Sequence, residues 1–215
     1  MMLLENRFWI STDTPRQSVS GAALFVDRDG VVIRETNYIS RIEDVVLENG
    51  IVELLGWAHE TGLATVIVTN QSGIARGMFD WLAFEAVHRE MTQQLHAAGV
   101  SIDLTIACPF HEEFTRGYGP AQARWRKPGA AMLELGGAMT ASDGRKSWMI
   151  GDRANDMKAA RNASLAGGIH VATSEGPDER AAALALAGDN FRVIGAAHPL
   201  EALQILRGKF TSNPL

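Results

Sequence analysis

The chain has 215 residues, of which 46% are hydrophobic and 21% are charged, a balance typical of one globular domain with its own core. The net charge of −5 at pH 7 gives no general attraction to nucleic acid or anionic membranes, and no stretch is apolar for long enough to span a bilayer. The single cysteine, Cys108, excludes an internal disulfide and favours a cytoplasmic location, where thiols stay reduced. We therefore expect neither nucleic acid nor a membrane as a partner.

The first 20 residues contain no basic segment followed by a long apolar run, so no export signal is predicted. We interpret residues 1–20 as an N-terminal extension, followed by a single domain over residues 21–210. The extension is expected to pack Phe8, Trp9 and Ile10 onto the domain, with partial disorder as the alternative.

From residue 22 onward, short apolar runs alternate with segments of helical periodicity. Strands are predicted in the runs AALFVD, LATVIVTN, LTIACP, SWMIGD, GGIHVAT and FRVIG. Helices are predicted over residues 49–61, 80–98, 129–138, 154–164, 177–187 and 198–207. Because the strand runs are apolar throughout, helices should cover both faces of the sheet. The pattern predicts an α/β fold, doubly wound around a mainly parallel sheet.

Two connections are longer than a turn between a strand and a helix requires, namely residues 30–48 and 109–128. No linker composition separates either segment from the rest of the chain. We expect both to be loops that form a small cap over a site, rather than a separate cap domain.

Polar residues follow several of the strand runs. The candidates are Asp27, Asp29 and Gly30 after the first run, Thr69, Asn70, Gln71 and Ser72 at the second, Arg126 and Lys127 before a helix, and Asp152, Arg153 and Asp156 after the fourth. In an open parallel sheet, ligands bind outside the carboxyl ends of the strands. These residues are therefore expected to meet at one edge of the sheet.

Carboxylates brought together at such an edge repel one another unless a cation lies between them, and hard oxygen ligands favour magnesium. Asp27 and Asp152 are therefore candidate Mg²⁺ ligands. Once a metal neutralises the approach of an anion, a carboxylate oxygen can attack phosphorus, so Asp27 is also the candidate nucleophile.

Asp29 is placed to protonate a leaving alkoxide and then to deprotonate water, while Gly30 lets the backbone turn away. The Thr69 hydroxyl, the amides around Asn70 and the Lys127 ammonium are candidate donors to a phosphoryl group. Asp156 is expected to orient Lys127, with a role in holding metal-bound water as the alternative.

The motifs Asp27-Arg28-Asp29-Gly30, TNQSGIARG at 69–77, Arg126-Lys127-Pro128 and Gly151-Asp152 followed by Asp156-Met157 resemble the haloacid dehalogenase-like hydrolase superfamily. The long second motif resembles the branch of D-glycero-D-manno-heptose 1,7-bisphosphate 7-phosphatases and histidinol-phosphatases. This resemblance extends over residues 22–205. It implies a Rossmann-like core and phosphate monoester hydrolysis with Mg²⁺ held by Asp27, the backbone carbonyl of Asp29, and Asp152.

The resemblance also implies that the segment after the first motif contacts the substrate. The candidate substrate-binding residues are Glu35, Thr36, Asn37, Tyr38, Asn70, Gln71, Ser72, Arg126 and Arg153. Of the residues after the first motif, Tyr38 matches the heptose enzymes well, and Arg153 stands where they often carry lysine.

Many members of this branch hold a structural zinc ion through a Cys-x-His pair and a Cys-x-Cys pair. In this chain the four positions are occupied by Cys108, Phe110, Ala123 and Trp125. With one ligand of four present, no zinc is predicted. We expect the loop to be held instead by aromatic packing, through Phe110, Phe114, Tyr118 and Trp125.

The leading hypothesis is a Mg²⁺-dependent phosphatase that acts on a small phosphorylated metabolite through an aspartyl-phosphate, with a sugar bisphosphate such as heptose 1,7-bisphosphate as substrate. One alternative keeps the mechanism but takes histidinol phosphate or another sugar or nucleotide monophosphate. A second is a non-catalytic binding module on a phosphatase scaffold, against which the intact set of catalytic side chains argues. The resemblance slightly favours a monomer.

Overall fold

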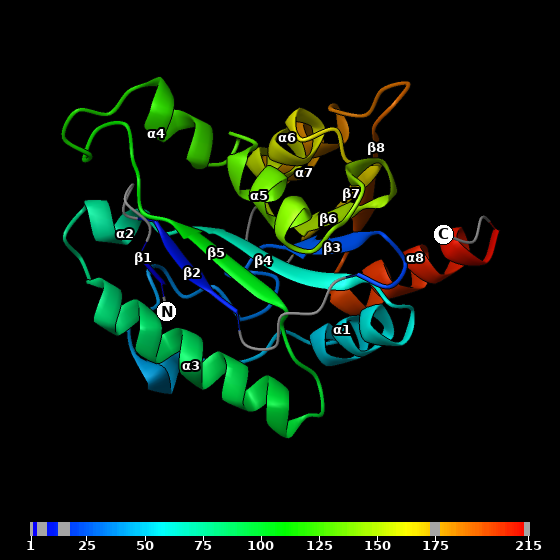
Figure 1. The fold of residues 1–215 in the computed structure, drawn as a ribbon, viewed down its shortest axis with the longest axis horizontal. Helices are drawn as coiled ribbons and strands as arrows, with labels where there is room; N and C mark the ends of the chain where they lie inside the picture. The colour runs from blue at the N-terminus through cyan, green and yellow to red at the C-terminus, as the bar shows by residue number, and fades with distance from the viewer. Residues whose placement is uncertain (1, 4–7, 13–17, 173–176, 213–215) are drawn as a thin grey trace.

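The computed structural model describes residues 2–3, 8–12, 18–172 and 177–212. Within these residues, eight strands form one sheet in the order β1-β2-β5-β4-β3-β6-β7-β8 (Figure 1). Their bounds are β1 Met2–Leu3, β2 Trp9–Ser11, β3 Ala23–Val26, β4 Ala64–Asn70, β5 Leu104–Cys108, β6 Trp148–Gly151, β7 Gly167–Val171 and β8 Arg192–Ala196.

The strands from β3 to β8 pair in parallel, whereas β2 pairs antiparallel with β5 at one edge and β1 pairs antiparallel with β2. From β3 the chain moves outward through β4 to β5 and then returns to place β6 on the other side of β3. This reversal creates a crevice between the carboxyl ends of β3 and β6, where ligands of such folds bind. The predicted doubly wound, mainly parallel α/β fold is confirmed.

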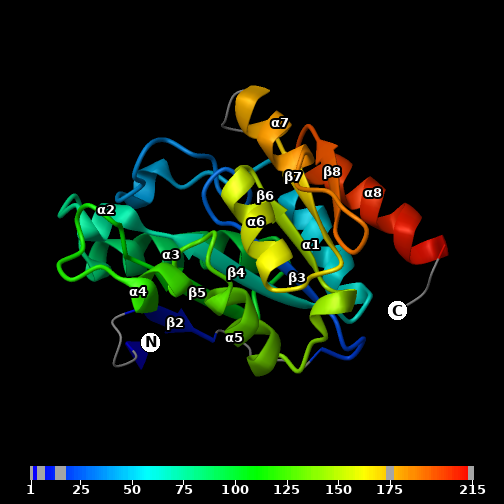
Figure 2. The same cartoon turned by 90° about the horizontal axis from the view of Figure 1, so that it is seen from above.

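Helices cover both faces of the sheet (Figures 1 and 2). The face packed by α1 (Ile51–Glu60), α3 (Trp81–Ala97) and α8 (Pro199–Ser212) forms one apolar cluster. The opposite face is packed by α5 (Ala131–Met139), α6 (Ala154–Asn162) and α7 (Pro177–Leu184). None of the helices in the described part of the chain is long and apolar enough to cross a membrane.

Strand β3 shows why the predicted strand runs are apolar throughout. Leu24 and Val26 face the cluster of α1, α3 and α8, while Ala23 and Phe25 face that of α5, α6 and α7. Since successive side chains of a strand point to opposite faces, a strand covered on both sides needs an apolar residue at every position.

The two long connections contain more regular structure than predicted. Helix α4 (Pro120–Trp125) lies in the second of them, and the 3-10 helix η1 (Ile42–Asp44) lies in the first. The TNQSGIARG motif forms the short helix α2 (Ser72–Ala75), and a second 3-10 helix, η2 (Gly144–Lys146), precedes β6. Elements of three to six residues are too short to produce a readable hydrophobic period, which explains why they were missed.

The N-terminal segment contributes a strand that was not predicted. Phe8, Trp9 and Ile10 are all buried, and β2 pairs with β5 in the register Trp9↔Ala107 and Ile10↔Ile106. A strand of three residues gives no periodic signal, and its position depends on the exposed edge of β5, which the sequence does not show.

Candidate active site

A cavity of about 320 Å³ opens at the carboxyl ends of β3 and β4, beside the N-terminus of α6. Most of its walls are polar or charged. The lining residues are Asp27, Arg28, Asp29, Glu35, Asn37, Tyr38, Ile39, Thr69, Asn70, Gln71, Ser72, Gly73, Arg126, Lys127, Arg153, Asn155 and Asp156. The structure thus gathers most of the predicted site residues around one cavity.

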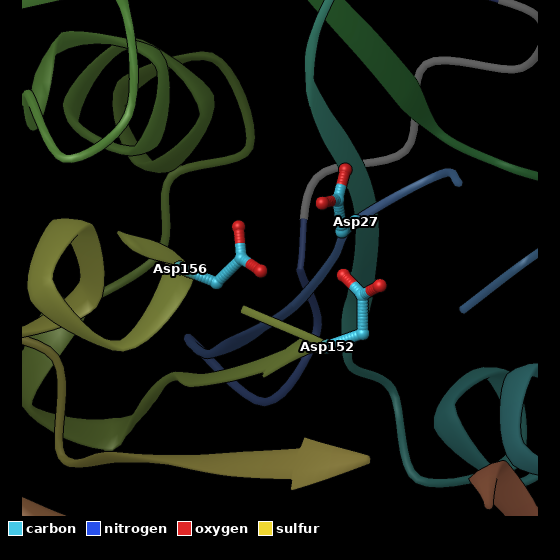
Figure 3. Close-up of side chains that lie close together, drawn as sticks. All are labelled: Asp27, Asp152 and Asp156. Carbon is cyan, nitrogen blue, oxygen red and sulfur yellow. The ribbon is translucent and has the colours of Figure 1, made fainter. Parts of the chain in front are cut away.

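Three buried aspartates form the base of the site. Asp27 directly follows β3, Asp152 directly follows β6, and Asp156 lies in the first turn of α6. One carboxylate oxygen of each lies within 4.8 Å of the others, and Figure 3 shows the three side chains reaching the same region from different segments. The expected pairing of Asp27 with Asp152 is present in the geometry, with Asp156 added as a third carboxylate.

Lys127 is buried between two of these carboxylates. Its Nζ lies 2.9 Å from Asp27 Oδ2 and 2.7 Å from Asp156 Oδ1, and it donates a 2.8 Å hydrogen bond to the Val68 carbonyl. Burial alone would lower the pKa of Lys127, but Asp156 and Asp27 outweigh it and raise this pKa to about 12. Lys127 therefore stays positively charged, and Asp156 is in place to orient it as predicted.

The backbone around this lysine is fixed by Asn70 at the end of β4. The Asn70 side chain accepts a hydrogen bond of 3.0 Å from the Lys127 N–H and donates one of 3.0 Å to the Lys127 carbonyl. Asn70, which was predicted to bind substrate, lines the cavity, and its amide group holds the loop that carries Lys127. These two hydrogen bonds fix the backbone of Lys127, and so the point from which its side chain enters the site.

Asp156 approaches the end of β6 so closely that a side chain there would collide with it. A Cβ added to Gly151 would lie 2.5 Å from Asp156 Cγ. Asp156 is held from the other side by a 3.0 Å hydrogen bond from the Arg153 N–H to its Oδ2. Glycine at position 151 is therefore what lets the carboxylate reach Lys127.

The charges of the site do not balance. Burial raises the pKa of Asp27 to about 7, because the loss of hydration outweighs the attraction of Lys127, and Asp156 and Asp29 add repulsion. Lys127 pairs with two carboxylates, and Asp152 brings a third to the same cluster. One ammonium is thus shared by a cluster of three carboxyl groups. A divalent cation bound by oxygen ligands fits this donor set.

The Asp29 carboxylate is held apart from this cluster by two neighbours. Arg28 Nε donates a 2.9 Å hydrogen bond to Asp29 Oδ1, and Gln71 Nε2 donates one of 2.8 Å to Asp29 Oδ2. Gln71 Nε2 also donates to the Thr69 hydroxyl oxygen at 2.8 Å. The Thr69 oxygen therefore acts as an acceptor, which leaves its hydrogen to be donated into the cavity. Gln71, predicted to bind substrate, links Asp29 to Thr69.

The segment after the first motif forms the outer wall. Glu35, Asn37 and Tyr38 line the cavity, whereas the predicted Thr36 is exposed and does not line it. Asn37 and Tyr38 both have left-handed backbones, with φ of 61° and 60°, and the Asn37 N–H donates to Glu35 Oε1 at 2.6 Å. Burial, reinforced by Asp29, raises the pKa of Glu35. A left-handed backbone turns the side chain in a direction that secondary-structure propensity does not predict, so the sequence could not show which of these residues face the cavity.

Two arginines complete the wall. Arg126 donates a 3.0 Å hydrogen bond from Nη1 to the Phe110 carbonyl, and Arg153 lies at the start of α6. Both were predicted, and both line the cavity. Arg28 and Asn155 also line it and were missed as site residues. For Arg28 the sequence offered one signal, because this charged residue lies between the candidate catalytic residues Asp27 and Asp29.

The loop that lacks most of the zinc ligands is packed by aromatic side chains, but not by all those predicted. Phe110, Tyr118 and Trp125 belong to the cluster under α5 and α6, whereas Phe114 is 45% exposed and lies under the Arg76 guanidinium at 4.2 Å. The expected role of Phe114 was therefore wrong. Its place is taken by Phe8, which stacks on Trp125 with ring centroids 3.9 Å apart.

Zinc is expected to be absent from the purified protein. Cys108 is buried among apolar side chains, and this burial raises the pKa of its thiol to about 12, which disfavours the thiolate that binds metal. Elemental analysis of protein purified without chelators is expected to give well under one zinc per chain. Stoichiometric zinc would contradict this prediction. Zinc that is lost in a Cys108→Ser variant would place the ion in this loop, against the aromatic packing, whereas zinc retained in that variant would place it elsewhere.

Comparison with known proteins agrees with this geometry. A HAD-hydrolase-like family model matches residues 124–192. Over 149 residues, the chain is 40% identical to a D-glycero-beta-D-manno-heptose-1,7-bisphosphate 7-phosphatase of Mesorhizobium japonicum, covering 68% of this chain and 67% of that one. The chain belongs to the haloacid dehalogenase-like hydrolases. Within this superfamily it lies in the branch of heptose-bisphosphate phosphatases, and it is a phosphoric monoester hydrolase by class.

Two further relatives support this placement. An enzyme of the same name from Photorhabdus laumondii is 35% identical, over 71% of this chain and 81% of that one. The crystal structure of a D,D-heptose 1,7-bisphosphate phosphatase from B. bronchiseptica, complexed with magnesium and phosphate, superposes with a TM-score of 0.72 at 26% identity. That alignment covers 87% of this chain and 99% of the other.

Proposed function

We propose that this haloacid dehalogenase-like phosphatase hydrolyses a small sugar bisphosphate, with D-glycero-D-manno-heptose 1,7-bisphosphate as the leading candidate, through a phosphoryl group carried on Asp27. The observation that carries the mechanism is the position of Asp27. Its carboxylate lines the cavity while Lys127, at 2.9 Å, and two further buried aspartates lie beside it. A nucleophile bordered by a fixed cation is suited to attack a phosphoryl group.

Magnesium would be held by Asp27 and Asp152, with the Asp29 carbonyl as the third protein ligand. The cluster of three aspartates around the single Lys127 ammonium supports a divalent cation at this place. The B. bronchiseptica relative is complexed with magnesium. When bound, Mg²⁺ supplies positive charge that lets an anionic phosphate approach an anionic nucleophile.

In the first step, an oxygen of Asp27 forms a bond to phosphorus and the bond from phosphorus to the sugar oxygen breaks. The electron pair of that broken bond goes to the sugar oxygen, which takes a proton from Asp29. Lys127 and the Thr69 hydroxyl donate hydrogen bonds to the phosphoryl oxygens, where negative charge is spread in the transition state.

In the second step, water attacks the phosphorus of the aspartyl-phosphate and the bond from phosphorus to Asp27 breaks. Asp29, now ionised, accepts the proton of the water, so that free Asp27 and inorganic phosphate are restored. The hydrogen bonds from Arg28 and Gln71 to Asp29 fix the position of this carboxyl group for both proton transfers.

Three features of the cavity support a phosphorylated sugar as substrate. Its 320 Å³ suits a small metabolite, Arg126 and Arg153 can pair with a second phosphate, and Glu35, with Asn37 and Tyr38 beside it, can accept or donate hydrogen bonds to hydroxyl groups. Relatives at 40% and 35% identity carry the name of a heptose-bisphosphate phosphatase.

The test is phosphate release from a panel that contains D-glycero-D-manno-heptose 1,7-bisphosphate as both anomers, histidinol phosphate, other sugar phosphates, nucleoside monophosphates and p-nitrophenyl phosphate. We expect the heptose bisphosphate to have the highest kcat/KM and to lose a single phosphate. Chelation of Mg²⁺ should abolish turnover, and added Mg²⁺ should restore it and raise the melting temperature.

The outcomes separate the alternatives. A preference for histidinol phosphate or a nucleotide would keep the mechanism and reject the sugar bisphosphate. Turnover that survives exhaustive chelation would reject the metal. Binding of phosphate esters without any release of phosphate would show a binding module on a phosphatase scaffold.

A further inference from the structure

The N-terminal strand β2 lies between β1 and β5 near one edge of the sheet. It pairs with β5 in the register Trp9↔Ala107, and Figures 1 and 2 show it beside β5. Phe8 packs in the cluster under α5 and α6, and Trp9 packs on the other face against α3. Two adjacent residues thus reach opposite faces of the sheet.

Phe8 connects this strand to the loop that ends in the catalytic lysine. Its ring stacks on Trp125 with centroids 3.9 Å apart and an angle of 27° between the planes. Trp125 is the last residue of α4 and is followed by Arg126 and Lys127, which both line the cavity. The Lys127 backbone is also held by Asn70. The contribution of Phe8 should therefore appear mainly at Arg126.

Trp9 connects the strand to Asp29 through two intermediates. Its ring meets the Phe84 ring edge-on, with centroids 5.0 Å apart, and the Arg28 guanidinium carbon lies 4.9 Å from the centre of that same ring. Arg28 in turn pairs with Asp29, with Nη2 2.8 Å from Oδ1. Both rings are buried, so they fix the plane on which the guanidinium rests.

The surroundings of Arg28 strengthen this pair. Arg28 is 1% exposed, and a charge–charge contact shielded from water is stronger than one in solvent. His88 packs on Trp9 with ring centroids 4.7 Å apart. Burial, helped by the Arg28 charge, lowers the pKa of His88 to about 3. It is therefore neutral and adds no second cation beside Arg28.

We propose that Phe8 and Trp9 are positioning residues of the active site. Trp9 orients Asp29 by way of Phe84 and Arg28, and Phe8 orients Arg126 by way of Trp125. This inference rests on the proposed function, since it assigns Asp29 to proton transfer and Arg126 to substrate binding. It gives the segment before the first strand of the parallel sheet a part in catalysis as well as in folding.

The experiment compares Trp9→Leu, Trp9→Phe and Phe8→Leu with Ile10→Ala as the matched control. Ile10 is buried in the same strand but is not part of either aromatic chain. Circular dichroism and melting curves define a temperature at which all four variants are folded. At that temperature kcat and KM are measured with Mg²⁺ on the best substrate of the panel and on p-nitrophenyl phosphate.

We expect Trp9→Leu to lower kcat about tenfold with little change in KM, because small displacements of a catalytic group are costly. Trp9→Phe should restore most of the lost kcat, since a phenyl edge can still meet Phe84. Phe8→Leu should chiefly raise KM for a bisphosphate. Ile10→Ala should stay within about twofold of the parent in both constants, despite its lower stability.

A double-mutant cycle with Arg28→Lys tests the route. If Trp9 acts through Arg28, Trp9→Leu should have little further effect on kcat once Arg28 has been changed. Additive effects of the two substitutions on kcat would overturn the inference. So would losses of kcat in Trp9→Leu and Ile10→Ala that simply follow their losses of stability. Either result would leave the proposed function intact. A parent protein that releases no phosphate from any substrate would overturn the proposed function and this inference with it.

Discussion

Replacing Asp27 by asparagine is expected to abolish turnover while leaving the protein folded. An amide is not a nucleophile toward phosphorus, so kcat should fall on the order of 10⁴-fold or more, as in other enzymes that lose a nucleophile. The substitution changes the side chain by one atom and keeps an oxygen that can accept a hydrogen bond from Lys127, which now lies 2.9 Å from Asp27.

The stability of Asp27→Asn should not fall, and the pKa of Asp27 gives the sign. Burial raises this pKa from its ordinary value to about 7 in the folded protein. The cost to folding free energy is therefore absent below the ordinary pKa of 3.8, grows as the pH rises from there, and is complete above about pH 7. Asparagine resembles the neutral form. Without Mg²⁺ and above neutral pH, the variant should melt at or above the temperature of the parent.

Phosphate release and melting curves, each with and without Mg²⁺, measure both effects. Asp103→Asn is the matched control, because Asp103 is also buried and accepts hydrogen bonds from the Thr65 N–H at 2.8 Å and from the Thr65 hydroxyl at 3.0 Å. It does not line the cavity. We expect Asp103→Asn to lose stability and keep its turnover. Substantial activity in Asp27→Asn would show that another group is the nucleophile.

Replacing Lys127 by methionine is expected to damage both catalysis and stability. Methionine has a similar length but no charge, so Asp27 and Asp156 would lose the ammonium that lies 2.9 Å and 2.7 Å from them. Removing one partner of a buried ion pair costs about 3–5 kcal/mol of folding free energy. The loss of a preorganised donor to the phosphoryl group should lower kcat by roughly 10²–10³-fold.

Urea unfolding and phosphate release test the Lys127 variant. Lys158→Met, on an exposed position of α6, removes the same charge and should change neither quantity by much. Mg²⁺ should recover part of the stability of Lys127→Met, since it supplies positive charge to the same carboxylates, but little of the kcat. A kcat within a few fold of the parent would mean that Lys127 holds the site together without contacting the phosphoryl group.

The long elements and the core of the site could be predicted from the sequence for physical reasons. Strands such as β3 are covered on both faces, so every position needs an apolar side chain. Asp27 and Asp152 end neighbouring parallel strands, which fixes their carboxylates at one edge whatever the details of packing. Asp27, Thr69 and Asp152 lie at or directly after strand ends, so their meeting follows from the topology of the sheet.

The rest depended on contacts between segments far apart in the chain. Gln71 and Asn70, which were expected to bind substrate, line the cavity, and their side chains also hold Asp29 and the Lys127 backbone, which the sequence did not indicate. Phe114 was expected to pack the loop and is exposed instead, with Phe8 stacked on Trp125 in its place. Side chains with several possible partners cannot be assigned until the backbone fixes which partner is in reach.

Taken alone, the sequence determined which carboxylates and which lysine meet, the fold that brings them together, and the superfamily to which they belong. Only the tertiary structure decided how these groups are supported. Asp156 reaches Lys127 because residue 151 has no side chain, and Arg28 holds Asp29 because Phe84 and Trp9 lie behind it. The alternation of strands and helices follows from local patterns, whereas such supports depend on distances between side chains that are set only when the whole chain packs.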